Sequence, residues 1–224
     1  MDWQPLFISI TTIYTMNQRE VWDNIADDWN NYRKHPPKDS VKFLENKRGI
    51  ILDLACGSGR NFIKINGIII GLDFSTRMLR LSRNKIKNDT PSVFLAAGDA
   101  VHLPFKDNIF DNILFSNSFH CVKWNHREKV LREIKRVSKN GAQIYISVWN
   151  RDQPRFETSK KESYIEWTVK GKRYQRYYYL YSKDELEALM KKYFKNVKVF
   201  GGGEKAFKKY SKNIIAIAKV KKTN

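Results

Sequence analysis

The sequence predicts an α/β fold built on a mostly parallel sheet, and three observations support this. Four short apolar runs, over 51–54, 68–73, 93–96 and 110–116, have the length and composition of buried strands. Segments with helical spacing of apolar residues lie between them. The first run contains Asp53 and leads into a loop with two glycines. In open α/β sheets such a loop marks the end of the strands where ligands bind.

The elements before the first strand are predicted to be two helices. Apolar residues at 21, 22, 25 and 29 give one helix a buried face over 18–31. The segment 33–37 contains two prolines and ends it, and a second helix is expected over 39–46. After the second strand, Ser75 is predicted to cap a helix that starts near Thr76.

The second half of the chain is predicted to complete a seven-stranded sheet whose last strand is antiparallel. Residues 150–181 are polar, basic and aromatic, with Gly171 between two β-like runs, which indicates a hairpin insertion on the substrate side. The other expected elements are a helix over 126–138 stopped at 139–141, a strand over 142–149, a helix opened by a capping box at 182–185 and running to about 193, and an antiparallel pair over 197–200 and 214–218.

Composition indicates a single reduced, cytoplasmic domain over 16–224, with 1–15 interpreted as an extension that arises, on one hypothesis, from start-codon choice. No apolar run reaches the ~18 residues of a membrane span. The two cysteines, Cys56 and Cys121, lack metal-ligand spacing, so no metal site is expected. The net charge is +19, of which residues 151–224 carry +12. This favours a polyanionic partner such as RNA, although a lysine-rich surface of a heat-adapted protein is the alternative.

The glycine loop lacks the third glycine of a dinucleotide fingerprint, because Phe62 occupies that position. Asp53 on the strand suits a ligand that is positively charged at that end. Asp73, at the end of the second strand, can accept hydrogen bonds from both ribose hydroxyls. Together with 98–100 after the third strand, these pieces resemble the motifs of class I S-adenosylmethionine (SAM) methyltransferases, which implies a Rossmann-like fold.

The resemblance implies that SAM is the cofactor and assigns a set of residues to it. Asp99 and the backbone of Ala100 would contact the adenine. Ala55 stands where many members of the family have glycine, and the short stretch from Gly59 to Asp73 leaves room for about one turn of helix. The cofactor residues implied are Asp53, Ala55, Cys56, Gly57, Gly59, Asp73, Phe74, Gly98, Asp99, Ala100 and Ser116.

A narrower resemblance is carried by the segment 103–111, His120, 148–149, the aromatic run 175–181 and the shortened first helix. These features are similar to the tRNA wobble-uridine methyltransferases, which esterify 5-carboxymethyluridine. A carboxylic acid with a pKa near ~4 is already ionised at neutral pH, so the acceptor requires no general base.

The substrate residues expected from this resemblance are Arg33, Arg176, Tyr177 and Tyr178, with His120 and Trp149 lining the pocket, and they would hold the carboxylate and the splayed base. Structural roles compete for each: a hydrogen-bonded core histidine, packing of the insertion, or a link from the opening helix to the domain. The family also implies a small zinc-binding activator protein that pairs with the edge strand 93–96. Cover by the N-terminal extension is equally compatible with that edge.

Two other functions stay open at this point. One is methyl transfer to a small molecule such as a lipid, quinone or organic acid, although the basic segment 150–181 differs from the apolar lid usual in such enzymes. The other is a noncatalytic SAM-binding RNA module. Cys121 lacks the Pro-Cys setting of a cytosine C5 nucleophile, so packing is the favoured role for that thiol.

Overall fold

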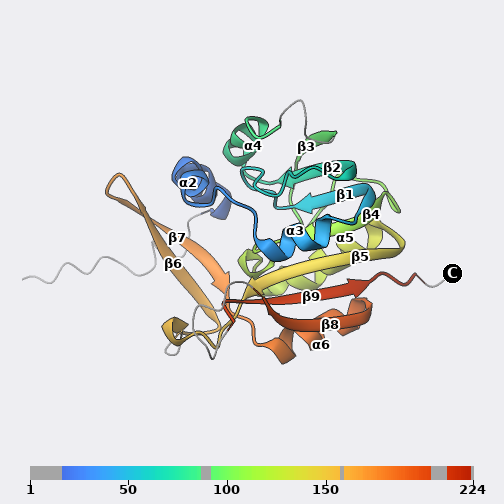
Figure 1. The fold of residues 1–224 in the computed structure, drawn as a ribbon. Coiled ribbons are helices and arrows are strands. Elements are labelled where there is room, and N and C mark those ends of the chain that lie inside the picture. Colours follow the sequence, from blue (N-terminus) through green and yellow to red (C-terminus); the bar gives the residue numbers. More distant parts are fainter. Residues whose placement is uncertain (1–16, 87–91, 157–158, 203–210, 223–224) are drawn as a thin grey trace, which may run out of the picture.

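The chain forms a seven-stranded sheet and a separate two-stranded hairpin (Figure 1). The computed structural model describes residues 17–86, 92–156, 159–202 and 211–222, so the expected extension over 1–15 lies outside it. Strands β1 to β5 run parallel, β9 runs antiparallel to β5, and β8 runs antiparallel to β9, which confirms the expected fold class. The sheet order is β3 (Val93–Ala97), β2 (Asn66–Asp73), β1 (Arg48–Leu54), β4 (Phe110–Phe115), β5 (Ser138–Trp149), β9 (Asn213–Lys219) and β8 (Lys195–Gly202).

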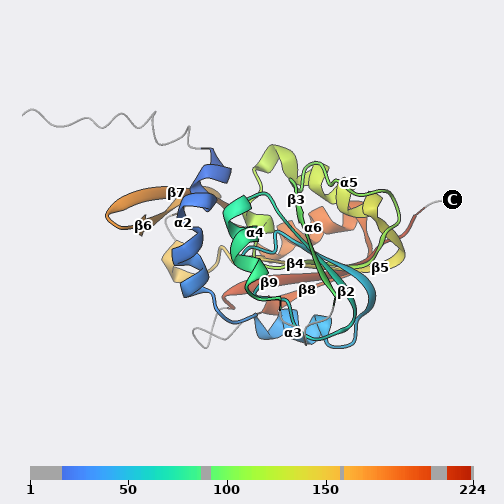
Figure 2. The ribbon, with the colours of Figure 1, turned by 90° about the horizontal axis from the view of Figure 1, so that it is seen from above.

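Helices cover both faces of this sheet because successive strand residues point to opposite sides. Leu52 on β1 belongs to the core formed with α5 and α6, whereas its neighbour Ile51 packs with Phe43 and Leu44 of α3. Figure 2 shows these layers from above. The five helices of the described chain are α2 (Gln18–Tyr32), α3 (Lys38–Leu44), α4 (Thr76–Arg83), α5 (Arg127–Val137) and α6 (Lys183–Tyr193).

The connection from β1 to β2 contains no helix. One helical turn was expected there, but the chain makes consecutive turns instead, and Phe62 packs into the space beside the sheet. A Cβ atom on Gly71 of β2 would lie 2.7 Å from Cζ of Phe62, and one on Gly59 would lie 2.6 Å from Cε2 of the same ring. The aromatic ring thus takes the place of a helix, and glycine at both positions makes room for it.

Helix α2 joins the cofactor-side helix α4 to the hairpin, which consists of β6 (Glu162–Val169) and β7 (Lys172–Tyr179). On the α4 side, Ser75 donates a hydrogen bond to Asp23 (2.6 Å). On the hairpin side, Gln18 accepts from Tyr177 N (2.9 Å) and donates to the carbonyl of Gln175 (3.1 Å). The order of contacts therefore makes α2 a bridge between two parts of the molecule (Figures 1 and 2).

Local sequence signals define most element ends. Ser75 caps α4 by accepting from Met78 N, and Ser182 caps α6 by accepting from Glu185 N, as expected. Helix α5 was expected to end at about Ser138 and ends at Val137, but β5 begins directly at Ser138 and not at the expected position 142. Ser138 caps the helix in an extended conformation, with its hydroxyl bonded to Ile134 O (2.6 Å). Among the described helices, none has the length and apolar character needed to span a membrane.

Candidate active site

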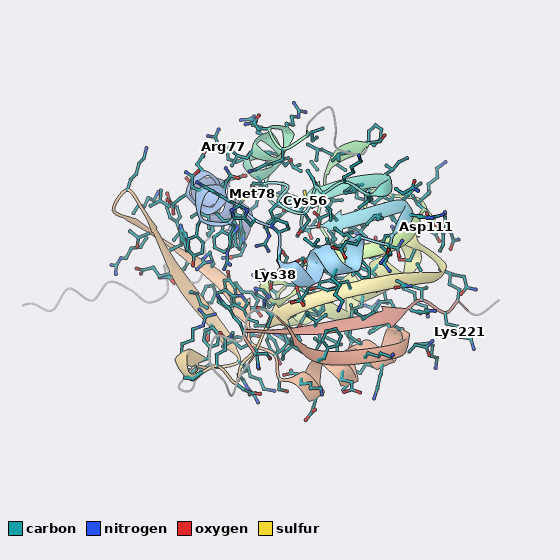
Figure 3. The ribbon with its side chains drawn as sticks, viewed as in Figure 1. Lys38, Cys56, Arg77, Met78, Asp111 and Lys221 are labelled. Atoms are coloured by element: carbon teal, nitrogen blue, oxygen red, sulfur yellow. The ribbon has the colours of Figure 1, made fainter. Side chains whose placement is uncertain are left out.

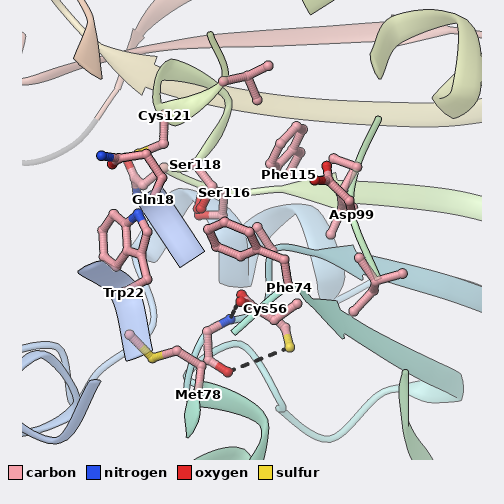
Figure 4. A pocket seen from close by; sticks show the side chains of 18 of the residues that line it. Gln18, Trp22, Cys56, Phe74, Met78, Asp99, Phe115, Ser116, Ser118 and Cys121 are labelled. Carbon is pink, nitrogen blue, oxygen red and sulfur yellow. Dashed lines mark hydrogen bonds between the residues drawn. The ribbon is translucent and has the colours of Figure 1, made fainter. Parts of the chain in front are cut away.

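A cavity of about 720 Å³ opens at the carboxyl ends of the central parallel strands. This volume falls in the ~300–1,000 Å³ range of small-molecule sites. Its walls come from the loops after β1, β2, β3 and β4, from helix α2, and from Trp149 and Tyr178. Figure 4 shows Cys56, Phe74 and Asp99 on one side and Gln18 and Trp22 on the other. In Figure 3, Cys56 lies at this end of the sheet and Asp111 at the opposite end.

The glycine loop after β1 bends toward the cavity through three residues with positive φ, Ala55 (55°), Gly57 (56°) and Gly59 (77°). A Cβ atom on Gly57 would have no neighbour within 4 Å, so this part of the loop faces open space. Ala55, Cys56 and Gly57 line the cavity, whereas Gly59 packs against Phe62 behind it. The loop therefore exposes backbone where a ligand can approach closely.

Asp73 is 5% exposed and lines the cavity at the end of β2. Its carboxylate accepts from Gly57 N (2.8 Å) and Ser75 N (2.9 Å), which fixes its orientation. Burial raises the pKa of this carboxyl to about 6, and the hydrogen bonds from Ser75 and Gly57 oppose that rise. Each carboxylate oxygen keeps a further acceptor position, so the group can hold two hydroxyls.

Asp53 does not line the cavity, although it lies at the same end of the sheet. It is 1% exposed, and Asn61 Nδ2 lies 3.3 and 3.4 Å from its two oxygens. Burial raises the pKa of Asp53 to about 7. Asn61 itself lines the cavity, and its Oδ1 is buried without a hydrogen-bond partner. A ligand ammonium group would satisfy that oxygen, so Asn61 connects Asp53 to the site.

The remaining residues expected at the cofactor all line the cavity: Phe74, Gly98, Asp99, Ala100 and Ser116. Asp99 is exposed, and its Oδ1 accepts from Val101 N (3.0 Å). The hydroxyl of Ser116 is bonded to that of Ser40 (2.8 Å). These positions fit an extended ligand with an adenosine at one end and an amino acid at the other.

The other end of the cavity is built on His120, which is 1% exposed. Its ring packs against those of Trp149 (5.3 Å between centroids) and Tyr178 (5.0 Å), which also contact each other (4.5 Å). Its Nδ1 accepts from Trp149 N (3.3 Å), so the neutral ring carries its proton on Nε2. Burial, together with the surrounding arginines, lowers the pKa of His120 to about 3. His120 is therefore a neutral hydrogen-bond donor at physiological pH.

Four arginines lie around this stack: Arg33, Arg60, Arg155 and Arg176. Arg33 and Arg60 line the cavity. Burial lowers the pKa of Arg60 to about 10, and repulsion from Arg33 adds a smaller effect in the same direction. Among the residues that the structure describes, none of the four has a carboxylate within 4 Å. Within the described chain, this end of the site therefore carries arginines that form no ion pair within 4 Å, although Asp53 attracts Arg60 from a longer distance.

Arg176 and Tyr177 do not line the cavity. Arg176 is 2% exposed and lies over the rings of Trp29 (5.1 Å) and Trp167 (4.8 Å), with Nη1 donating to Tyr178 Oη (2.8 Å). Tyr177 points to the other face of the hairpin, as strand alternation requires, and its hydroxyl accepts from Trp124 N (3.2 Å). Arg176 thus acts on the site through Tyr178.

Sequence reasoning did not select Gln18, Trp22, Arg60 or Asn61, which also line the cavity. Gln18 and Trp22 arrive there because α2 docks on α4 and the hairpin, a tertiary arrangement with no local signal. Arg60 and Asn61 directly follow the glycine loop, and that position was the one sign available. In a chain with a regular first helix, these two residues would belong to its first turn.

Comparisons with known proteins agree with this geometry. Residues 51–141 match the family model described as a methyltransferase domain. This segment therefore resembles a methyltransferase domain, and the chain has the Rossmann-like α/β fold of methyltransferases. Its cofactor is S-adenosylmethionine, and the free acceptor positions of Asp73 and of Asn61 Oδ1 fit the ribose hydroxyls and the ammonium group of that molecule.

Proteins similar in sequence to this chain are named for different activities. A demethylmenaquinone methyltransferase of Lactiplantibacillus plantarum is 38% identical over 113 residues, which cover 46% of this chain and 47% of the relative. A putative methyltransferase of Encephalitozoon cuniculi is 29% identical over 156 residues, 65% of this chain and 70% of that protein. The chain spans about half the length of the quinone methyltransferases it matches.

Solved structures share the fold at low sequence identity. A putative methyltransferase in complex with the Haloferax volcanii Trm112 methyltransferase activator has a TM-score of 0.72 and 17% identity, covering 93% of this chain and 99% of that one. The 1,6-didemethyltoxoflavin-N1-methyltransferase of Burkholderia thailandensis has a TM-score of 0.68 and 16% identity, covering 99% of this chain and 94% of that chain.

Proposed function

We propose that this protein is a SAM-dependent methyltransferase that esterifies a carboxylate, that of 5-carboxymethyluridine at the wobble position of tRNA. The observation that carries this proposal is the group of four arginines around His120 without a carboxylate partner among the described residues. SAM itself brings a net positive charge at neutral pH. An anionic acceptor would offset the positive charge of the arginines and of SAM.

The reaction needs alignment more than acid–base chemistry. A carboxylate oxygen attacks the methyl carbon as the carbon–sulfur bond breaks, giving a methyl ester and S-adenosylhomocysteine. The positive sulfonium and the negative carboxylate both become neutral, so aromatic walls that exclude water favour the step. His120 supplies an N–H donor and Arg33 a guanidinium that can orient the carboxylate.

The same geometry disfavours the second candidate, methylation of a quinone ring. The names of the L. plantarum relative and of similar proteins favour that activity. Methylation of a phenolic ring carbon requires a base to remove a proton. Around the acceptor end, His120 has its Nδ1 lone pair engaged and a pKa of about 3, and burial raises the pKa of Cys121 to about 12. Neither group is suited to that role.

We also propose a small zinc-binding activator protein as a partner at β3. β3 is an edge strand of the sheet, and Phe94 on it is 59% exposed. The similar fold that was solved with an activator protein supports this type of partner. Strand addition to β3 would cover the exposed ring and complete the edge.

The test uses labelled SAM with three acceptors, with and without the activator: tRNA carrying 5-carboxymethyluridine, the same tRNA with uridine, and a demethylmenaquinone. We expect label only on the first, and mild alkali should release it as methanol because the product is an ester. Label that resists alkali, or label on the quinone, would overturn the proposal. SAM binding without transfer to any acceptor would indicate a noncatalytic module.

A matched pair of variants tests the role of the arginines. Arg33→Gln should lower kcat/KM for tRNA by about 10- to 100-fold, because charge-assisted bonds contribute about 1.5–3 kcal/mol. Affinity for S-adenosylhomocysteine should change by less than about twofold. Arg132→Gln, on the exposed face of α5, serves as the control and should change neither quantity. Equal loss of cofactor affinity in Arg33→Gln would assign this arginine to the cofactor instead.

A further inference from the structure

The β6–β7 hairpin stands out from the body of the molecule and ends in a basic tip (Figures 1 and 2). The tip sequence is Lys170-Gly171-Lys172-Arg173, and all four residues are exposed. Both turn residues have positive φ, 48° for Lys170 and 78° for Gly171, as a two-residue hairpin turn requires. Asparagine or glycine suits the first of these positions, yet the chain has a lysine there.

Two of the three cations at the tip form no ion pair with a described residue. Arg173 pairs with Glu166 (3.7 Å). Within the described chain, neither Lys170 nor Lys172 has a carboxylate within 4 Å, and the Lys172 ammonium lies over the ring of Tyr174 (5.3 Å). The nearby acids on α2 have other hydrogen-bonded partners: Asp27 pairs with Arg77 and is attracted only weakly to Lys170, and Asp28 accepts from Trp167.

The tip is held at a fixed distance from the cavity. Tyr174 is 6% exposed and packs with Val21 and Ile25 of α2, so the hairpin is anchored along its length. Lys172 lies six positions along β7 from Tyr178, which lines the cavity. At ~3.3 Å per residue, this places the tip about 20 Å from the acceptor end.

We infer that the hairpin tip binds backbone phosphates of the same RNA that places its acceptor nucleotide in the cavity. This inference rests on the proposed function. A polyanion with one end in the cavity passes several phosphates within 20 Å of it, and the two lysines on a rigid arm match them in charge. The contact would position the RNA and would not read its sequence.

The test is the Lys170→Asn/Lys172→Ser double variant, in which asparagine retains the left-handed turn. Methyl transfer is measured on tRNA carrying 5-carboxymethyluridine and on the free nucleoside, which cannot reach the tip. We expect KM for tRNA to rise about tenfold near 0.1 M salt, and the slope of log(kcat/KM) against log salt to shrink by about 1.5 to 2. Kinetics with the nucleoside should not change.

A charge-matched control is Lys219→Ser/Lys221→Ser, at the opposite end of the sheet, which should leave all of these values unchanged. Equal effects of the tip and control pairs, or no effect of the tip pair, would overturn the inference. Equilibrium binding of the same tRNA at several salt concentrations separates the two proposals. If the wild type transfers no methyl group yet the tip pair still reduces the salt slope of binding, only the proposed function fails.

Discussion

Asp73 makes cofactor binding depend on pH. Burial raises the pKa of this carboxyl to about 6, so it is mostly protonated at pH 5 and ionised at pH 7.5. Ribose hydroxyls donate to the ionised form, and affinity should therefore increase as pH rises through 6. We expect S-adenosylhomocysteine to bind about tenfold more weakly at pH 5 than at pH 7.5, measured by calorimetry.

The Asp73→Asn variant supplies the control for this profile. It keeps the size of the side chain and lacks the ionisable group, so binding should be weak at both pH values, without the step near pH 6. Wild-type affinity in this variant would show that Asp73 does not hold the ribose.

At the scale of single residues, local motifs predicted several side chains that line one end of the cavity. Asp73, Gly57 and the segment 98–100 follow predicted strands, and in a parallel sheet the ends of neighbouring strands meet. The acceptor end was harder to predict. Tyr177 and Tyr178 were both expected there, but the register of β7 places only Tyr178 at the cavity, because neighbouring residues of a strand face opposite sides.

The connection between β1 and β2 makes a prediction at the scale of elements. Because Phe62 takes the place of a helix, Gly71→Ala would bring a Cβ atom to 2.7 Å from Cζ of Phe62 and 3.1 Å from Sγ of Cys56. Such crowding in a packed core costs about 1–3 kcal/mol of unfolding free energy. Urea denaturation would measure the loss.

A double-mutant cycle shows whether that ring is the cause. Leucine at position 62 lacks the Cζ atom, so Gly71→Ala should cost little in the Phe62→Leu background. Additive losses in the double variant would locate the strain elsewhere, for instance at Cys56.

The sequence predicted some helices and strands better than others, because only some features of the fold depend on local signals. Strands and capped helices carry their signals within a few residues, as at Ser75 and Ser182. The bridge made by α2 depends on Gln18 meeting β7 across 159 positions of sequence, for which no local pattern exists. For the connection after β1, the short stretch of sequence predicted a shortened helix, and the structure has no helix there.

At the scale of the whole molecule, each of the two edge strands of the large sheet carries an exposed phenylalanine. Phe94 on β3 is 59% exposed, and Phe200 on β8 is 42% exposed. Phe94→Asp should abolish co-purification with the proposed zinc-binding activator, because a charge would meet the apolar contact. Phe200→Asp should leave that complex intact, and both variants should bind S-adenosylhomocysteine normally.

The opposite pattern would redirect the partner search. Loss of the complex in Phe200→Asp but not in Phe94→Asp would place the activator at β8. Loss in neither variant would mean that the partner does not use a sheet edge of this chain.

Helix α2 lines the cavity while it is bonded to α4 through Asp23 and to the hairpin through Gln18. We expect release of S-adenosylhomocysteine and of the product to involve movement of the same helix. The steady-state turnover rate would then be limited by outward movement of α2. Added viscogen should therefore slow steady-state catalysis more than it slows a single chemical turnover.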